Sequence, residues 1–297
     1  MSFSLENSRI LLTGGTSHTG RRLARRLLER GVFLRCMLHN PSHRHLLPDS
    51  SRIEIVQGSA ESAGDLARAA DGIPTLVHLA HIRFAGPVIE ALSRRTDSIR
   101  LIATSSTRLM SNYHTATRDA VHAGEGIIKS APPHVQWTVL RPSMIFGGPD
   151  DNNIERLARL LRYCPVFPLF GNGRNLVQPL FVWDLVAAIE ACLERPETAG
   201  HSYVLAGPKP IPYRSMVEAV ARASGRRPPF FIRIPRRSAV GLAKLLRRIW
   251  ARSPLDPDAV RRFGEDRAFS IFPAQRDLGF NPTPFEQALE RKFRREV

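Results

Sequence analysis

Short apolar runs alternate with amphipathic segments over the first half of the chain. The runs have the length of buried strands, and in the segments between them apolar residues recur three and four positions apart, as on one side of a helix. This alternation predicts an α/β fold with a parallel, doubly wound sheet and helices on both faces. The predicted strands are residues 10–12, 32–38, 53–57, 75–80, 98–105 and 135–140, and the predicted helices are 20–28, 65–70, 82–93 and 118–130.

The pattern changes after Gly147, where the segments become less regular. Two stretches rich in proline and glycine, 164–174 and 226–235, are predicted to be a loop and a linker-like crossing. The segments between and after them indicate a smaller α+β region. Its predicted helices are residues 151–161, 184–194, 213–224 and 284–294, and its predicted strands are 176–181 and 201–205.

The first strand ends in Thr13-Gly14-Gly15, and Gly20 opens the first helix. A glycine turn between a strand and a helix allows close backbone approach to a ligand, and free N–H groups at the helix start bind a diphosphate. An ordinary turn that needs glycine for positive φ is the alternative. Ser17 stands where the closest backbone approach is expected, and its Cβ takes space from a phosphate while its hydroxyl offers a hydrogen bond.

The residues after the second strand bear on the choice of dinucleotide. An acidic side chain there binds the ribose 2′-hydroxyl of NAD, and the loop that follows residue 38 has none. His39, Arg44 and Arg35 favour a 2′-phosphate instead, so NADP is preferred over NAD. The alternative is that these are solvated surface bases.

Composition narrows the possible classes of protein. The formal net charge of +16 suggests an anionic ligand or an acidic partner, but only four of the 43 basic residues are lysine and the arginines are spread over most helices. This spread argues against a specific nucleic-acid site. The three cysteines have no metal-binding spacing, so no metal site and a reducing, cytoplasmic location are expected. No apolar run is long enough to span a bilayer.

Residues 238–252 combine apolar positions with Lys244, Arg247, Arg248 and Arg252. This pattern predicts a basic amphipathic helix. Such a helix either docks its apolar side on the smaller region or lies on an anionic membrane surface. The second interpretation predicts peripheral membrane association.

Several motifs together resemble the extended short-chain dehydrogenase/reductase family, within its NAD-dependent epimerase/dehydratase group. They follow the family's order over nearly the whole chain, which makes the joint match far more specific than the glycine turn. Residues 141–153 and 171–180 also resemble the branch that contains the dehydrogenase-like accessory subunit of respiratory complex I. The motifs are T-G-G-T-S-H-T-G (13–20), L-V-H-L-A (76–80), A-T-S-S-T (103–107), A-G-E-G-I-I (123–128), W-T-V-L-R-P-S-M-I-F-G (137–147), Q-P-L-F-V-W-D-L-V-A-A-I (178–189) and D-L-G-F-N-P-T-P-F (277–285).

The resemblance implies a Rossmann-type NAD(P)-binding domain of residues 1–146 plus 182–196, because the helix that begins at Asp184 returns to it. A smaller C-terminal substrate-binding domain would comprise residues 147–181 plus 197–297. Arg141, Arg174 and Gln178 are the expected substrate contacts. The expected cofactor contacts are Thr13, Gly14, Thr16, Ser17, His18, Thr19, Gly20, His39, Arg44, Leu79, Ala80, His81, Thr104, Pro142 and Met144.

The family's catalytic pair is missing. Family oxidoreductases use a tyrosine and a lysine four residues later on one helical face, where the ammonium lowers the pKa of the phenol. Alignment on Glu125 puts Thr117 and Val121 at these positions, and neither transfers a proton in this way. Ser106 is at the family's serine position and could bind a substrate oxygen or cap the backbone. Tyr113 is a displaced general-acid candidate.

Other chemistry remains open. His81 or His114 could shuttle a proton near the nicotinamide. Arg141 could contact a phosphate or substrate anion, or form a salt bridge with Asp184. The sequence therefore predicts an NAD(P)-dependent oxidoreductase or epimerase/dehydratase-like protein with a non-standard active site, acting on a small molecule as a monomer or homodimer. The alternative is a non-catalytic NAD(P)-binding redox sensor or scaffold at a membrane surface.

Overall fold

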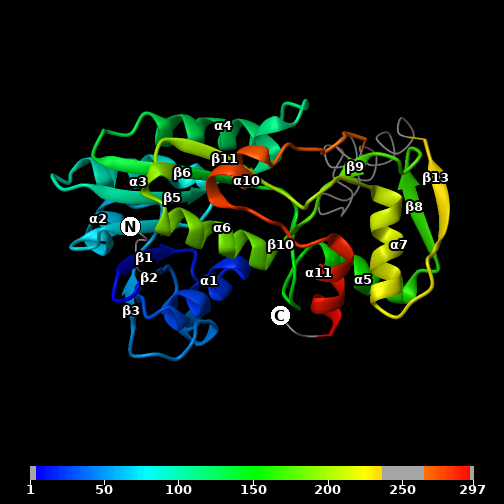
Figure 1. Cartoon of the computed structure of the whole chain (residues 1–297), viewed down its shortest axis with the longest axis horizontal. Helices are drawn as coiled ribbons and strands as arrows, with labels where there is room; N and C mark the ends of the chain where they lie inside the picture. Colours follow the sequence, from blue (N-terminus) through cyan, green and yellow to red (C-terminus); the bar gives the residue numbers. More distant parts are fainter. Residues whose placement is uncertain (1–4, 236–263, 295–297) are drawn as a thin grey trace, which may run out of the picture.

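The computed structural model describes residues 5–235 and 264–294, and its centre is a seven-stranded parallel sheet (Figure 1). The strand order is β11-β6-β5-β4-β1-β2-β3, which confirms the predicted doubly wound α/β architecture. The strands are β1 (Arg9–Thr13), β2 (Phe33–Leu38), β3 (Ile53–Gln57), β4 (Thr75–His78), β5 (Ile99–Thr104), β6 (Val135–Pro142) and β11 (His201–Leu205).

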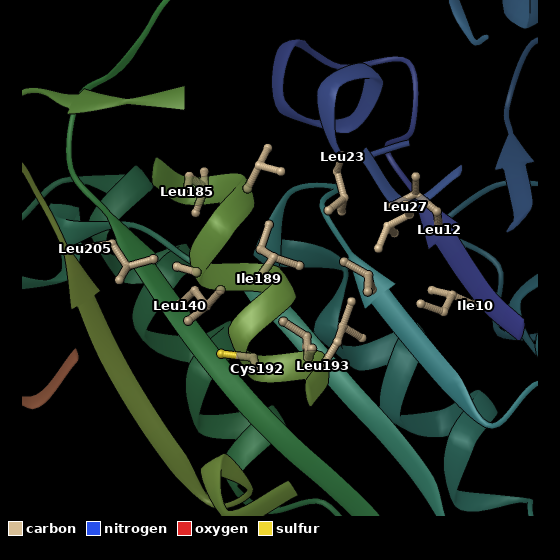
Figure 2. Packing of buried hydrophobic residues seen from close by; sticks show 14 of the residues in the cluster. Ile10, Leu12, Leu23, Leu27, Leu140, Leu185, Ile189, Cys192, Leu193 and Leu205 are labelled. Atoms are coloured by element: carbon tan, nitrogen blue, oxygen red, sulfur yellow. The ribbon is translucent and has the colours of Figure 1, made fainter. Parts of the chain in front are cut away.

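Two helical layers cover the sheet. One layer packs leucines of α1 and α6 against Ile10, Leu12 and Leu140, and Figure 2 shows Leu23 and Ile189 within this cluster. The other layer buries the apolar faces of α2, α3 and α4 on the opposite side. The first layer contains α1 (His18–Glu29), α6 (Val182–Glu194) and α10 (Phe272–Leu278), and the second contains α2 (Ala63–Ala70), α3 (Ala85–Ser93) and α4 (Ala116–Lys129).

A smaller lobe with its own core lies at one end of the molecule (Figure 1). Phe146 is buried there between the rings of Phe181 and Phe285, at 5.8 and 5.2 Å between centroids. The elements of this lobe are β7 (Ile145–Phe146), α5 (Ile154–Tyr163), β8 (Val166–Phe170), β9 (Leu176–Val177), β10 (Leu180–Phe181), β12 (Ile211–Pro212), α7 (Tyr213–Ala223), β13 (Phe230–Ile234) and α11 (Phe285–Phe293).

The structure differs from the sequence-based expectations at several places, and the predicted strand 176–181 is divided into β9 and β10. The expected loop and linker-like crossing contain β8 and β13, which pair in parallel with each other. Strand β11 pairs with β6 in the large sheet, although residues 197–297 were expected to form part of the smaller domain. Helix α10 packs on the large sheet as well. The remaining domain boundaries stay a prediction.

The predicted basic helix at 238–252 lies outside the described residues. No helix in the described part of the chain is long and apolar enough to cross a membrane.

Candidate nucleotide site

The glycine turn after β1 brings backbone segments into close contact. Gly14 has φ +70°, and a Cβ there would lie 2.8 Å from the Ala80 nitrogen and from the Leu79 carbonyl carbon. A Cβ on Gly20 would lie 2.2 Å from the Gly14 oxygen. Only glycine fits these two positions, which lets α1 begin directly above the ends of β1 and β4.

Ser17 is the N-cap of α1. Its Oγ accepts the Gly20 N–H at 3.0 Å, and its own N–H donates to the Gly14 oxygen at 3.0 Å. Two N–H groups at the start of the helix are therefore already bonded within the chain. The Ser17 side chain is exposed, and a hydroxyl that accepts one bond still has its proton to donate.

A pocket of about 390 Å³ opens at the carboxyl ends of β1, β2, β3 and β4. This is the edge where open α/β sheets bind nucleotides. Of the expected cofactor contacts, Thr13, Gly14, Thr16, His39 and Ala80 line it. Its other walls are Met37, Leu38, Asn40, His43, Gly58, Ser59, Ala60, Glu61 and Phe84.

Only some of the basic residues expected near the cofactor line the pocket. His39 lines the pocket, and so does His43, which the sequence did not single out. Arg44 does not, because its guanidinium donates to the Leu47 and Pro48 carbonyls and pairs with an aspartate. Arg35 is also turned elsewhere, bonding across the sheet to Glu54 at 2.8 Å.

A carboxylate from the smaller lobe sits beside the start of α1. Asp150 pairs with His18 Nδ1 at 3.0 Å, with Arg22 at 3.1 Å and with Arg21. Burial raises the pKa of Asp150, but the charges and hydrogen bonds of His18 and Arg22 outweigh it and hold the pKa below its usual value. Burial lowers the pKa of His18. Sequence analysis did not identify Asp150, because it lies 128 residues from Arg22.

The end of β4 carries two histidines with different surroundings. His78 is fully buried, its Nδ1 lies 2.8 Å from Thr13 Oγ1, and burial lowers its pKa to about 4. His81 caps a short turn through its Nδ1, and burial with Arg83 and Arg108 nearby lowers its pKa. Thr104 extends this end of the sheet and donates to the His78 oxygen at 3.3 Å.

The two catalytic candidates lie between β5 and α4. Ser106 Oγ accepts the Arg108 N–H at 3.2 Å, which is the backbone cap expected as one alternative for this residue. The hydroxyl proton remains available to another acceptor. Tyr113 is half-buried in the loop before α4. Thr117 lies in the first turn of that helix, and Val121 is buried in the core beneath it.

Arg141, at the end of β6, is engaged by a buried glutamate. Its Nε lies 2.9 Å and its terminal nitrogen 2.6 Å from the two oxygens of Glu125, which also accepts the Ser105 hydroxyl at 2.6 Å. The guanidinium is paired with Glu125 and not with Asp184, which instead accepts the Thr283 N–H and hydroxyl. The sequence analysis had used Glu125 only as an alignment anchor.

The side chain of Gln178 is hydrogen-bonded within the chain. Its amide nitrogen donates to the Gly207 oxygen at 2.7 Å, and its amide oxygen accepts the Phe269 N–H at 2.7 Å. Both ends of the side chain are therefore occupied, and the residue is buried. Arg174 is exposed on the neighbouring turn. Glu265, which the sequence did not identify, accepts from the Ser111 hydroxyl and ties residues 264–270 to the loop that carries Tyr113.

The remaining expected cofactor contacts do not line this pocket. Leu79 donates to the Thr13 oxygen at 3.1 Å, and Thr19 is buried in α1. Pro142 ends β6, and Met144 accepts the Leu180 N–H at 2.9 Å where the chain enters the smaller lobe.

Comparison with known proteins agrees with this geometry. A family model described as NAD(P)H-binding matches residues 14–159. The chain is 26% identical to a 3β-hydroxysteroid dehydrogenase/Δ5→4-isomerase of Mycobacterium tuberculosis, over 95% of this chain and 88% of that protein. It is 25% identical to a 2-alkyl-3-oxoalkanoate reductase of Stenotrophomonas maltophilia, over 95% and 98%.

Solved structures share the fold. An epimerase from Methanothermobacter thermautotrophicus superposes with a TM-score of 0.77 at 20% identity, covering 98% of this chain and 92% of that one. A dTDP-glucose 4,6-dehydratase from Bacillus anthracis in complex with NAD gives 0.74 at 17% identity, covering 97% and 96%. The narrower likeness to the complex I branch stays an expectation. Residues 14–159 thus match an NAD(P)H-binding family model, and nearly the whole chain is similar to dehydrogenases and reductases and shares the fold of epimerases and dehydratases.

Proposed function

We propose that the protein is an NADP(H)-preferring oxidoreductase that interconverts a carbonyl and a hydroxyl group without a tyrosine–lysine pair. The observation that carries the proposal is the pocket at the carboxyl ends of β1–β4, walled by Gly14 and by two histidines at the end of β2. The residues fit a dinucleotide, because Gly14 and Thr16 line the pocket and Thr16 and Ser17 offer hydroxyl groups to a diphosphate. When bound, a nicotinamide supplies the hydride chemistry.

The preference for a 2′-phosphate rests on His39 and His43. Both line the pocket, and the residues at the end of β2 include no carboxylate to bind a 2′-hydroxyl or repel a phosphate. Glu61, at the far wall, lies within 3.8 Å of Arg83, which offsets its charge. Arg44 is not part of the proposal, since its guanidinium is bonded to its own turn.

The proposed chemistry uses two hydroxyl groups. Ser106 accepts a backbone N–H and has its proton free to donate to a substrate oxygen, and Tyr113 is the proposed proton donor or acceptor. The dehydrogenase and reductase names of the relatives support a substrate with a hydroxyl or oxo group on an apolar skeleton. Arg174 is exposed on the turn before Gln178 and is proposed to meet an anionic group of that substrate.

A turnover assay with active-site variants tests the proposal. NADPH oxidation is followed with a panel of 3-oxo substrates, including a 3-oxosteroid and a 3-oxoalkanoate, for the wild type, Ser106→Ala and Tyr113→Phe. Loss of one catalytic hydroxyl is expected to lower kcat by about 100-fold, whereas Ser130→Ala, at the distant end of α4, retains full activity. Turnover that is equal in all four proteins would contradict the assignment of these hydroxyls.

A non-catalytic dinucleotide-binding protein is the second candidate. The occupied side chains of Arg141 and Gln178 favour it, because both were expected to face a substrate and both instead bond within the chain. This candidate predicts saturable NADPH binding together with no turnover of any substrate in the panel.

A further inference from the structure

The two-stranded β8–β13 ribbon has apolar residues on both faces. Its parallel register pairs Phe230 with Val166 and Ile232 with Pro168. All four side chains are exposed: Phe230 by 80%, Ile232 by 56% and Val166 by 42% of their surface. These four residues form the outer face of the ribbon.

The inner face of the ribbon already supplies the core of the smaller lobe. Phe167 and Leu169 are buried, and Phe167 packs edge-on against Phe231 at 6.3 Å between ring centroids. A sheet that covers a core on one side and meets water on the other normally alternates apolar with polar residues. The outer face breaks this rule, and a contiguous exposed apolar patch marks an interaction surface.

A cationic cavity of about 860 Å³ adjoins the start of the ribbon. Arg162 precedes β8, Arg226 precedes β13, and both line the cavity together with Arg159. Within the described part of the chain, none of these three guanidinium groups has a carboxylate partner. Lys292 also lines the cavity, but Asp151 and Glu155 neutralise it at 3.0 and 2.9 Å.

An exposed tyrosine and additional basic residues lie next to the ribbon and the cavity. Tyr163, at the cavity mouth, has 72% of its surface exposed. Arg227 lies three residues before β13 and Arg233 lies within it, and both are exposed. The basic amphipathic sequence 238–252, whose structure lies outside the described residues, begins four residues after that strand ends.

We propose that the outer face of the ribbon and the arginine-lined cavity together bind an anionic lipid bilayer. Phe230, Ile232 and Val166 enter the interfacial region, and Arg159, Arg162 and Arg226 contact headgroup phosphates at its edge. Aromatic and aliphatic groups flanked by arginine are the chemistry that binds at an anionic interface. A second copy of the chain is the poorer occupant, because a symmetric contact at this face would bring the same arginines together.

Flotation with vesicles tests the proposal on the full chain. Vesicles of phosphatidylcholine alone and with 30% phosphatidylglycerol are the probes, a composition on the order of cellular anionic lipid content. The expected result is binding to the anionic vesicles that weakens as salt is raised and is absent on pure phosphatidylcholine. Phe230→Ser with Ile232→Ser, and Arg159→Gln with Arg162→Gln and Arg226→Gln, each lower the bound fraction at limiting lipid by about tenfold or more.

Phe272→Ser is the matched control, because Phe272 is 63% exposed on α10, on the large sheet rather than on the ribbon. It is expected to bind vesicles like the wild type. Circular dichroism and thermal unfolding verify that the variants are folded. We expect them to fold, because the altered side chains are exposed. The proposal is overturned by equal vesicle binding in the ribbon variants and the control, by no vesicle binding at all, or by a dimer that the ribbon variants convert to monomer.

Discussion

Arg141 holds Glu125 through two parallel contacts, with Nε 2.9 Å from one carboxylate oxygen and a terminal nitrogen 2.6 Å from the other. Glu125 comes from α4 and Arg141 from the end of β6, so the pair joins helix to sheet beside the candidate catalytic loop. Burial raises the pKa of Glu125, but the hydrogen bonds from Arg141 and Ser105 outweigh it and keep the pKa below its ordinary value.

Removal of this arginine is expected to destabilise the fold. Arg141→Met leaves the Glu125 carboxylate buried without its main partner, which costs about 3–5 kcal/mol in the free energy of unfolding. Lys129→Met is the control, because Lys129 lies 3.5 Å from the same carboxylate but is 43% exposed, and its loss costs less than about 1 kcal/mol. Urea unfolding measures both. Wild-type stability in Arg141→Met would refute the structural role and favour the substrate-anion interpretation.

Restoration of the family's catalytic pair is expected to fail. Val121 is only 1% exposed within the apolar cluster below the sheet, so Val121→Lys buries an unpaired ammonium. Thr117→Tyr with Val121→Lys should lose about 3 kcal/mol or more of stability and gain no activity. Val121→Met introduces a larger side chain without a charge, so it should destabilise the fold less than Val121→Lys. A folded, newly active double variant would contradict this account of α4.

The acid sensitivity of the protein is expected to depend on His78. In the unfolded chain this histidine has its ordinary pKa of 6.5, whereas burial lowers its pKa to about 4 in the folded protein. Between these values the unfolded state binds the additional proton, so stability decreases as the pH falls from 6.5 to 4. The loss is at most roughly 3 kcal/mol.

Unfolding measured at several pH values between 4 and 7 tests the His78 prediction. His78→Gln should flatten the profile in this range, whereas His122→Gln, at an exposed position on α4, should leave the slope of the wild type unchanged. Identical slopes in all three proteins would show that another group causes the acid sensitivity.

The choice between the two dinucleotides is expected to depend on His39 rather than on Arg44. His39→Asp puts a carboxylate in the pocket, where it repels a 2′-phosphate and accepts a bond from a 2′-hydroxyl. NADPH affinity should fall about tenfold or more, equivalent to about 1.4 kcal/mol, while NADH affinity holds or rises. Arg44→Gln should leave the ratio of NADPH to NADH affinity unchanged. Calorimetric titration of each variant with both cofactors measures these affinities. A changed ratio in Arg44→Gln with an unchanged ratio in His39→Asp would contradict the prediction.

The sequence predicted most of the large sheet, because β1, β3, β4 and β5 are short apolar runs that each lead to an α-helix. It failed at β8 and β13, where prolines suggested irregular chain although Phe167 and Phe231 face a common core. Prolines are tolerated in edge strands, and a two-stranded ribbon consists only of edges. Strand β11 was recognised as strand-like, but its pairing with β6 depends on contacts 60 or more residues apart.

Site residues were predicted best where the backbone defines the site. Gly14 and Gly20 are required by sterics that the local pattern already expresses. Side chains with distant partners were predicted poorly, because the partners of Arg141 and Gln178 are set by packing between segments far apart in the chain. Asp150 was missed for the same reason, because its partner Arg22 lies 128 residues away in the chain.

Titration of the wild-type protein with NADPH, followed by intrinsic fluorescence and by thermal unfolding, is the most direct test of the proposed site at the ends of β1–β4. The account predicts saturable binding and a stabilisation that reaches about 2.7 kcal/mol when NADPH is at 100 times its Kd. An unchanged unfolding temperature and no fluorescence change up to about millimolar NADPH and NADH would contradict it.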